Sequence, residues 1–191
     1  MDADFAVELG RDDETLEIPW ATPDGGPRYI DLKRHPELLD EIDEACREPA
    51  LREFLLAANA ADGPFETAKC DVWHTSEINP EEEIHGFPLK FGCYVDLLFS
   101  DGRRTSFPQH EYLAKKLVEL LRRVPEIPAS AEILIRRAFF RDQDSTEGCY
   151  FTIYVFGFGD DEESAHKQWV IGLKLLENAL RQVARSMETP V

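Results

Sequence analysis

Two segments decide the fold of this chain: FGCYVDLLFS at residues 91–100 and CYFTIYVFGF at residues 149–158. Successive side chains of a β-strand point to opposite faces, so each segment divides into two sets of residues. One set is apolar, as in Cys93, Val95 and Leu97. The other set is mainly aromatic and polar, and it includes Tyr94, Asp96, Tyr150, Thr152 and Tyr154. Both segments therefore predict long strands with one face in the core and a second face of different chemistry.

The neighbouring segments predict the rest of the sheet. Residues 65–78 and 133–140 have the composition of strands, and each precedes one of the two deciding segments. Amphipathic stripes at helical spacing begin near Pro36, Gln109 and Asp160. With a short strand over residues 29–32 before the first helix, the predicted order after the N-terminal hairpin is β-α-β-β-α-β-β-α.

This order predicts an α+β protein with an antiparallel or mixed sheet and with the helices mainly on one face. Its β-α-β-β-α-β portion favours a ferredoxin-like core with an added strand and a C-terminal helix. Gly-Cys-Tyr occurs at residues 92–94 and again at 148–150, which raises the hypothesis of a duplicated α-β-β unit. Residues 1–32 alternate on both sides of a Gly-Arg-Asp-Asp turn and predict an N-terminal hairpin followed by a turn-rich segment.

Length and composition favour one domain. The chain has 191 residues, of which 43% are hydrophobic, and these values fit a single α+β domain over residues 1–191. No apolar run reaches the roughly 18 residues of a membrane span, so no contact with a membrane is expected. The acidic start and four cysteines without a Cys-x-x-Cys pair predict a cytoplasmic protein with reduced thiols.

The charge is strongly negative and unevenly distributed. A formal net charge of −17 argues against binding to nucleic acid. Residues 1–100 hold 24 acidic and 8 basic groups, whereas residues 101–191 hold 14 and 13. The imbalance predicts an acidic patch that attracts a basic protein partner, as in an immunity or inhibitor protein, although solubility alone is the simpler explanation. We expect the patch to consist of Asp40, Glu41, Asp43, Glu44 and Glu48 together with Glu81, Glu82 and Glu83.

The motifs give no support for a resident cofactor or metal. Cys70 and His74 would lie roughly 13 Å apart on a strand, which is too far for one zinc ion. Gly157-Phe158-Gly159 lacks the third glycine of a dinucleotide loop and precedes four acidic residues that would repel a phosphate. We therefore expect no metal and no cofactor.

The best candidate site is the aromatic and polar face of the sheet. Arg136 and Arg137 lie in an otherwise apolar strand, so one of them must pair with a carboxylate or reach water, and Asp71 or Asp96 is the natural candidate for the carboxylate. If the helices cover one face only, these groups line the other. The expected ligand or interface residues are Lys69, Asp71, Trp73, Tyr94, Asp96, Arg136, Tyr150 and Tyr154.

This face predicts a binding protein, because Trp and Tyr are enriched at interfaces. Self-association as a homodimer is the simplest form, and a different partner is the other. The rival interpretation is a hydrolase or isomerase-type enzyme with His74 and Asp71 or Asp96 as acid and base. Alternation places His74 on the opposite face from both carboxylates, which weighs against the enzyme. An internal salt bridge without function also explains the charged groups.

Overall fold

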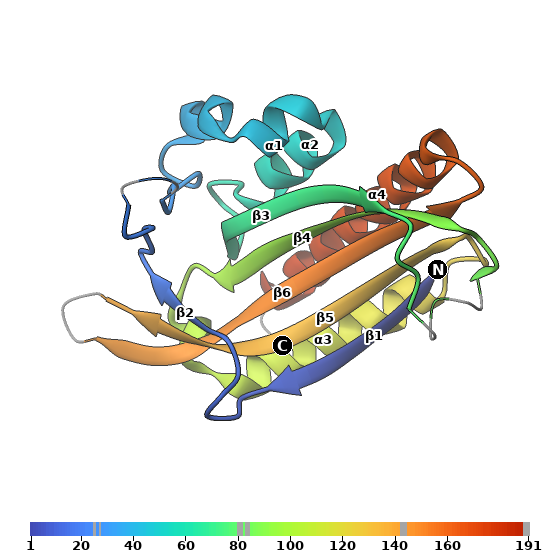
Figure 1. The fold of residues 1–191 in the computed structure, drawn as a ribbon. Coiled ribbons are helices and arrows are strands. Elements are labelled where there is room, and N and C mark those ends of the chain that lie inside the picture. The colour runs from blue at the N-terminus through green and yellow to red at the C-terminus, as the bar shows by residue number, and fades with distance from the viewer. Residues whose placement is uncertain (25, 27, 80–81, 83–84, 142–144, 189–191) are drawn as a thin grey trace.

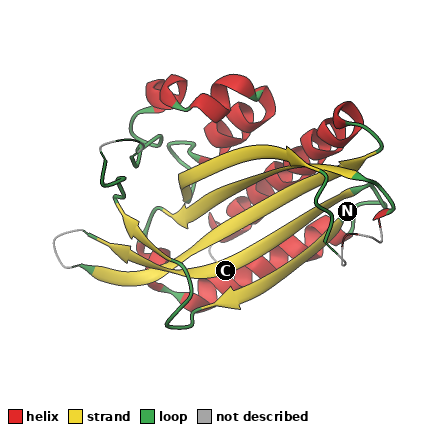
Figure 2. Cartoon of the chain, in the orientation of Figure 1, coloured by secondary structure: helices red, strands yellow, loops and turns green. Residues whose placement is uncertain are grey.

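The computed structural model describes residues 1–188 except 25, 27, 80–81, 83–84 and 142–144. It is an α+β protein with a six-stranded mixed open sheet (Figures 1 and 2). The strands lie in the order β1-β5-β6-β4-β3, and β2 also pairs with β5. Their bounds are β1 Asp2–Glu8, β2 Thr15–Ile18, β3 Phe65–Thr75, β4 Leu89–Phe99, β5 Ala129–Phe140 and β6 Thr146–Gly159.

The two deciding segments form the centre of the sheet. They lie in β4 and β6, which pair with each other in antiparallel register, with Asp96 opposite Thr152. Each central strand also pairs in antiparallel fashion with the strand that precedes it in sequence, β3 or β5. The predicted strands are therefore confirmed, and two hairpins make up most of the sheet.

The helices lie mainly on one face of the sheet, which we call the covered face. The long helices α3 (Phe107–Arg122) and α4 (Glu162–Glu188) run behind the strands in Figure 1. The short helices α1 (Asp43–Arg47) and α2 (Pro49–Ala58) follow a 3-10 helix at Pro36–Glu41 and lie beside β3. The main core fills the covered face, and its largest fully buried side chains include Trp169, Phe54, Phe99 and Phe151.

Two topological predictions are wrong. In a ferredoxin-like core the strand before the first helix is a central neighbour of the third strand, but the segment expected to supply it, residues 29–32, forms no strand, and β4 lies between β3 and β6 instead. The expected N-terminal hairpin does not form either, because β1 and β2 both pair in parallel with β5. A turn closed by Asp13, which accepts a hydrogen bond from the Gly10 N–H at 2.6 Å, directs the chain away from the edge of β5 and back.

The opposite face, which we call the open face, carries a second small core at one end. Leu16, Ile18 and Trp20, with Tyr29, form a covering segment over Ala68, Leu98, Ala138, Phe140 and Tyr150. Ile18 O accepts a hydrogen bond from Arg141 N beyond β5, and the Trp20 indole donates to Ala68 O on β3 at 2.9 Å. The covering segment therefore crosses the sheet from the β5 edge toward β3.

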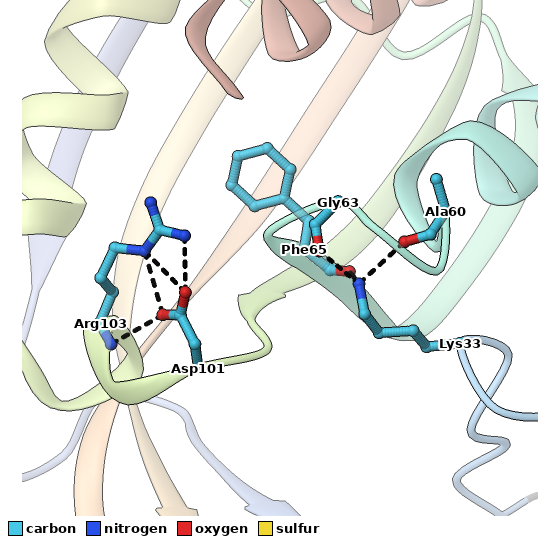
Figure 3. Close-up of polar contacts among 6 residues, drawn as sticks. All are labelled: Lys33, Ala60, Gly63, Phe65, Asp101 and Arg103. Carbon is cyan, nitrogen blue, oxygen red and sulfur yellow. Dashed lines mark hydrogen bonds and ion pairs between the residues drawn. The ribbon is translucent and has the colours of Figure 1, made fainter. Parts of the chain in front are cut away.

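Lys33 lies between this covering segment and the first helices, and its side chain binds the turn that follows α2. Its ammonium donates to the carbonyl oxygens of Ala60, Gly63 and Phe65 at 2.9, 2.6 and 2.9 Å (Figure 3). Burial lowers the pKa of Lys33, and nearby carboxylates such as Glu66 oppose that shift. Three carbonyls thus depend on one side chain at the turn from α2 into β3.

Substitution of Lys33 by Met should lower the free energy of unfolding by roughly 1–3 kcal/mol, because partly buried carbonyls would lose their donor. Lys167→Met is the matched control, since Lys167 pairs with Glu163 on α4 and both side chains are mostly exposed. An exposed ion pair contributes about 1 kcal/mol or less. Urea unfolding of both variants measures the difference, and an equal loss in the two would contradict the role assigned to Lys33.

Candidate functional site

The uncovered part of the open face carries a group of four aromatic side chains, which we call the aromatic cluster. Trp73, Tyr94, Tyr154 and Phe156 come from β3, β4 and β6. Ring centroids lie 6.3 Å apart for Trp73 and Tyr94, 6.4 Å for Trp73 and Tyr154, and 6.0 Å for Tyr94 and Tyr154. All four side chains are partly exposed. The structure therefore brings three of the sequence-predicted residues together at the middle of a sheet.

Gly92 permits this arrangement. A Cβ atom on Gly92 would lie 2.6 Å from the ring of Phe156, so a larger residue would displace that ring. Beyond Phe156 the cluster ends at Lys90, whose ammonium lies 4.9 Å from the ring centroid and 2.7 Å from Glu82. This end of the cluster is held by a largely buried ion pair.

A buried polar chain lies next to the cluster. Asp96 is 2% exposed and accepts a hydrogen bond from the Thr152 hydroxyl at 2.8 Å. Arg136 donates to the same hydroxyl at 3.2 Å. Burial raises the pKa of Asp96 to about 7, against the opposing effects of Thr152 and Lys69. Asp96 thus changes charge near neutral pH at the centre of the open face.

The carboxylates that pair with Arg136 are not the predicted ones. Arg136 donates to Glu8 at 2.8 Å and to Glu14 at 2.9 Å, rather than to Asp71 or Asp96. Sequence reasoning missed both partners because the pairing of β1 with β5, which brings Glu8 to Arg136, joins segments more than 100 residues apart. The guanidinium is satisfied before any ligand binds.

Tyr150, like Asp96, is a predicted site residue that the structure buries. It is fully buried under the covering segment. Its hydroxyl makes no hydrogen bond of good geometry with a described residue. Tyr150 therefore belongs to the small core of the open face rather than to its exposed part.

Lys69 and Asp71 lie beside the cluster at a pocket of about 680 Å³. The ammonium of Lys69 lies 5.1 Å from the ring centroid of Trp20, and Asp71 is exposed. The pocket also contacts Tyr94, so it continues from the aromatic cluster along β3. Its other lining includes Arg28, Ile42 and the acidic residues Glu41, Asp43 and Glu44.

Acidic residues frame the open face. Ala3 and Ile133 point into the core on the covered face. The alternate positions on β1 and β5 therefore point to the open face, and they include Asp2, Asp4, Glu8 and Glu132. Burial raises the pKa of Glu132, and the neighbouring carboxylates of Glu8 and Asp4 raise it further. Arg136 opposes that shift. Negative charge therefore exceeds positive charge around the aromatic cluster.

The predicted acidic patch divides. Asp40, Glu41, Asp43, Glu44 and Glu48 all lie in the first helical region, where Asp40 pairs with Arg52 and Glu48 with His166. Glu82 pairs with Lys90 at the start of β4, and neither residue lines the pocket. Glu81 and Glu83 lie outside the described residues. Of the predicted patch, Glu41, Asp43 and Glu44 line the pocket beside the aromatic cluster.

The rival acid–base site does not assemble. His74 lies 3.8 Å from Glu162 at the start of α4, on the covered side of the sheet, whereas Asp96 faces the open side. Burial raises the pKa of Cys70 and of Cys93 to about 12, so neither is a ready thiolate. Across the described part of the chain, no three His, Cys, Asp or Glu side chains are placed to hold a metal ion, and no helix is long and apolar enough to span a membrane.

A second groove, of about 700 Å³, lies between α2 and α4. Its central carboxylate, Glu177, already pairs with Lys174 at 2.9 Å and with Arg181 at 2.7 Å. Because these charges satisfy one another, this groove offers less to a ligand than the open face does.

Phe156 is a member of the site that sequence reasoning missed, and Thr152 was assigned to the same face without being chosen as a site residue. Phe156 and Thr152 share the alternation of Tyr154, so the pattern that selected Tyr154 also marks them. Compared with protein-family models, with curated proteins and with solved structures, the chain has no significant match. The site must therefore be judged on its own geometry.

Asp96→Asn should remove a pH dependence of stability. Because burial raises the pKa of Asp96 in the folded state, its protonated form stabilises the fold below pH 4, and this contribution is lost as the pH rises to about 7. As the pH rises between these limits, the free energy of unfolding of the Asn variant should therefore increase by on the order of 2–4 kcal/mol relative to that of the parent. Urea unfolding in acid and in mild alkali measures the gain.

Asp71→Asn is the control, since it makes the same substitution at an exposed position of the open face. The difference between that variant and the parent should change little over the same range. A pH-independent difference for Asp96→Asn would contradict the environment described for Asp96.

Proposed function

We propose that this chain is a protein-binding protein whose open face holds a basic partner. The observation that carries the proposal is the aromatic cluster, four partly exposed rings in the middle of a sheet face. Large aromatic side chains that remain exposed are typical of the energetically dominant part of an interface. In the same sheet, the other end of the open face is buried by the chain's own covering segment.

The sign of the charge supports a basic partner. Asp71, Glu132 and Asp4 surround the cluster, and Glu41, Asp43 and Glu44 line the adjoining pocket. Complementary potentials increase the rate of encounter and select among partners. A cationic side chain would also interact favourably with the faces of Trp73 and Tyr94.

The proposal is tested by capture on the immobilised chain. The parent and Tyr112→Ala, which alters an exposed tyrosine on α3, should retain the same basic protein. Trp73→Ala and Tyr154→Ala should each weaken that retention about tenfold or more, as loss of a central aromatic residue does. Retention should also fall steeply as salt is raised, because the Debye length shortens to about 8 Å at physiological ionic strength. Captured proteins that are acidic, or that are retained equally by all four chains, would contradict the proposal.

Self-association through the open face is the alternative use of the same residues. A two-fold symmetric contact would place this acidic face against its own copy and bring like charges together. We therefore expect the parent to be a monomer by light scattering at low salt. A dimer that Trp73→Ala dissociates and Tyr112→Ala leaves intact would show that the occupant is a second copy.

A further inference from the structure

The two ends of the open face are related by an internal repeat in the chain. Asp96 lies opposite Thr152, which comes 56 residues later. The same separation relates Gly-Cys-Tyr at residues 92–94 to Gly-Cys-Tyr at residues 148–150. It also relates His110 on α3 to His166 on α4.

The buried sides of the two long helices follow the same register. Leu113 and Leu117 are matched by Trp169 and Leu173, and all four are at most 1% exposed. Helix α3 begins at Phe107 and α4 at Glu162, one residue before the position that the repeat predicts. The hairpins β3-β4 and β5-β6 are thus related by an approximate two-fold axis that passes between Asp96 and Thr152.

This axis relates the aromatic cluster to the small core on the open face. Tyr94 corresponds to Tyr150, and Leu98 corresponds to Tyr154. Tyr150 and Leu98 are completely buried, whereas Tyr94 and Tyr154 are partly exposed. The difference arises because Leu16, Ile18 and Trp20 cover only one of the two related surfaces.

The two-fold axis also predicts the direction in which a second segment would cross the open face over the aromatic cluster. In cis, the covering segment enters at the β5 edge, where β2 pairs with β5, and crosses to Ala68 on β3. Rotation about the axis exchanges the two edges of the four central strands. A segment related by the axis would enter at the β3 edge near Trp73 and cross toward β5.

We propose that the aromatic cluster receives an extended, basic segment of a partner protein, which crosses the open face as the covering segment does at the other end. This inference rests on the proposed function and specifies the form of the partner. Asp71 lies where the segment enters, and Glu132 lies near where it would end, so basic residues at both ends of the segment would meet carboxylates. Apolar residues between them would pack on Tyr94, Tyr154 and Phe156.

The probe is a labelled peptide with the sequence of residues 14–21, in which Glu14→Lys, Glu17→Lys and Ala21→Lys supply the basic groups and place a lysine at each end. The peptide retains the apolar residues that bury Tyr150 and Leu98 in cis. Fluorescence polarisation should give saturable binding, weakened about tenfold or more by Trp73→Ala or Tyr154→Ala and unchanged by Tyr112→Ala. The peptide with both glutamates retained should bind more weakly, by about tenfold or more at low salt.

Each other outcome overturns the inference. No saturable binding up to about 1 mM, the weak limit of a specific contact, would exclude this mode of docking. Equal binding of the acidic and basic peptides would exclude the electrostatic part, and binding insensitive to Trp73→Ala would place the peptide elsewhere. If the peptide fails while a basic protein is still captured in a Trp73-dependent way, the proposed function stands and the partner presents a folded surface instead.

Discussion

The antiparallel pairing of β4 with β6 is the contact on which the rest of the structure depends. Each of these strands is buried against helices on one side, and each carries one of the two outer hairpin strands along its other edge. The register of this pair places Asp96 against Thr152 at the centre of the open face and aligns Tyr94 with Tyr154. A shift of one residue would exchange the two faces of a strand and place the aromatic side chains in the core.

Coverage of the sheet then determines which surfaces are available. Helices α3 and α4 bury most of one face, and the covering segment buries one end of the other (Figure 1). The aromatic cluster remains as a partly exposed apolar area within an acidic frame. The edge strands carry their own protection, since Asp2, Asp4 and Asp71 each accept a hydrogen bond from the backbone N–H of the next residue, an N–H that would otherwise be free to pair with another strand. Contact with a partner is therefore expected on the face of the sheet rather than along its edges.

Local patterns in the sequence predicted the central part of this arrangement. Alternation identified the strands of both hairpins and separated Cys93 and Ile153 from Tyr94 and Tyr154, because a strand's period of two depends only on neighbouring residues. Helical stripes likewise located α3 and α4. The same local signal selected most of the candidate site, including Trp73 and Asp96, and it placed Thr152 on the same face. Applied one step further along β6, it would also have selected Phe156.

What could not be predicted depends on contacts between distant segments. Nothing near Glu8 or Glu14 indicates that Arg136 will pair with both, and nothing near Leu16 indicates that it will bury Tyr150. The parallel addition of β1 and β2 to β5 changed the topology from the expected ferredoxin-like order for the same reason. Burial of Tyr150, in turn, reduced the predicted site to the exposed half of the face.

The most direct test of the central claim is photo-crosslinking in the source cells, with benzoylphenylalanine placed at Tyr154 on the open face or at Tyr112 on α3. These two tyrosines are both accessible but lie on opposite sides of the sheet. The account predicts a discrete crosslinked adduct with a basic protein from position 154 and none from position 112. Crosslinks from position 112 alone, or the same adducts from both positions, would contradict the claim that the open face is the binding surface.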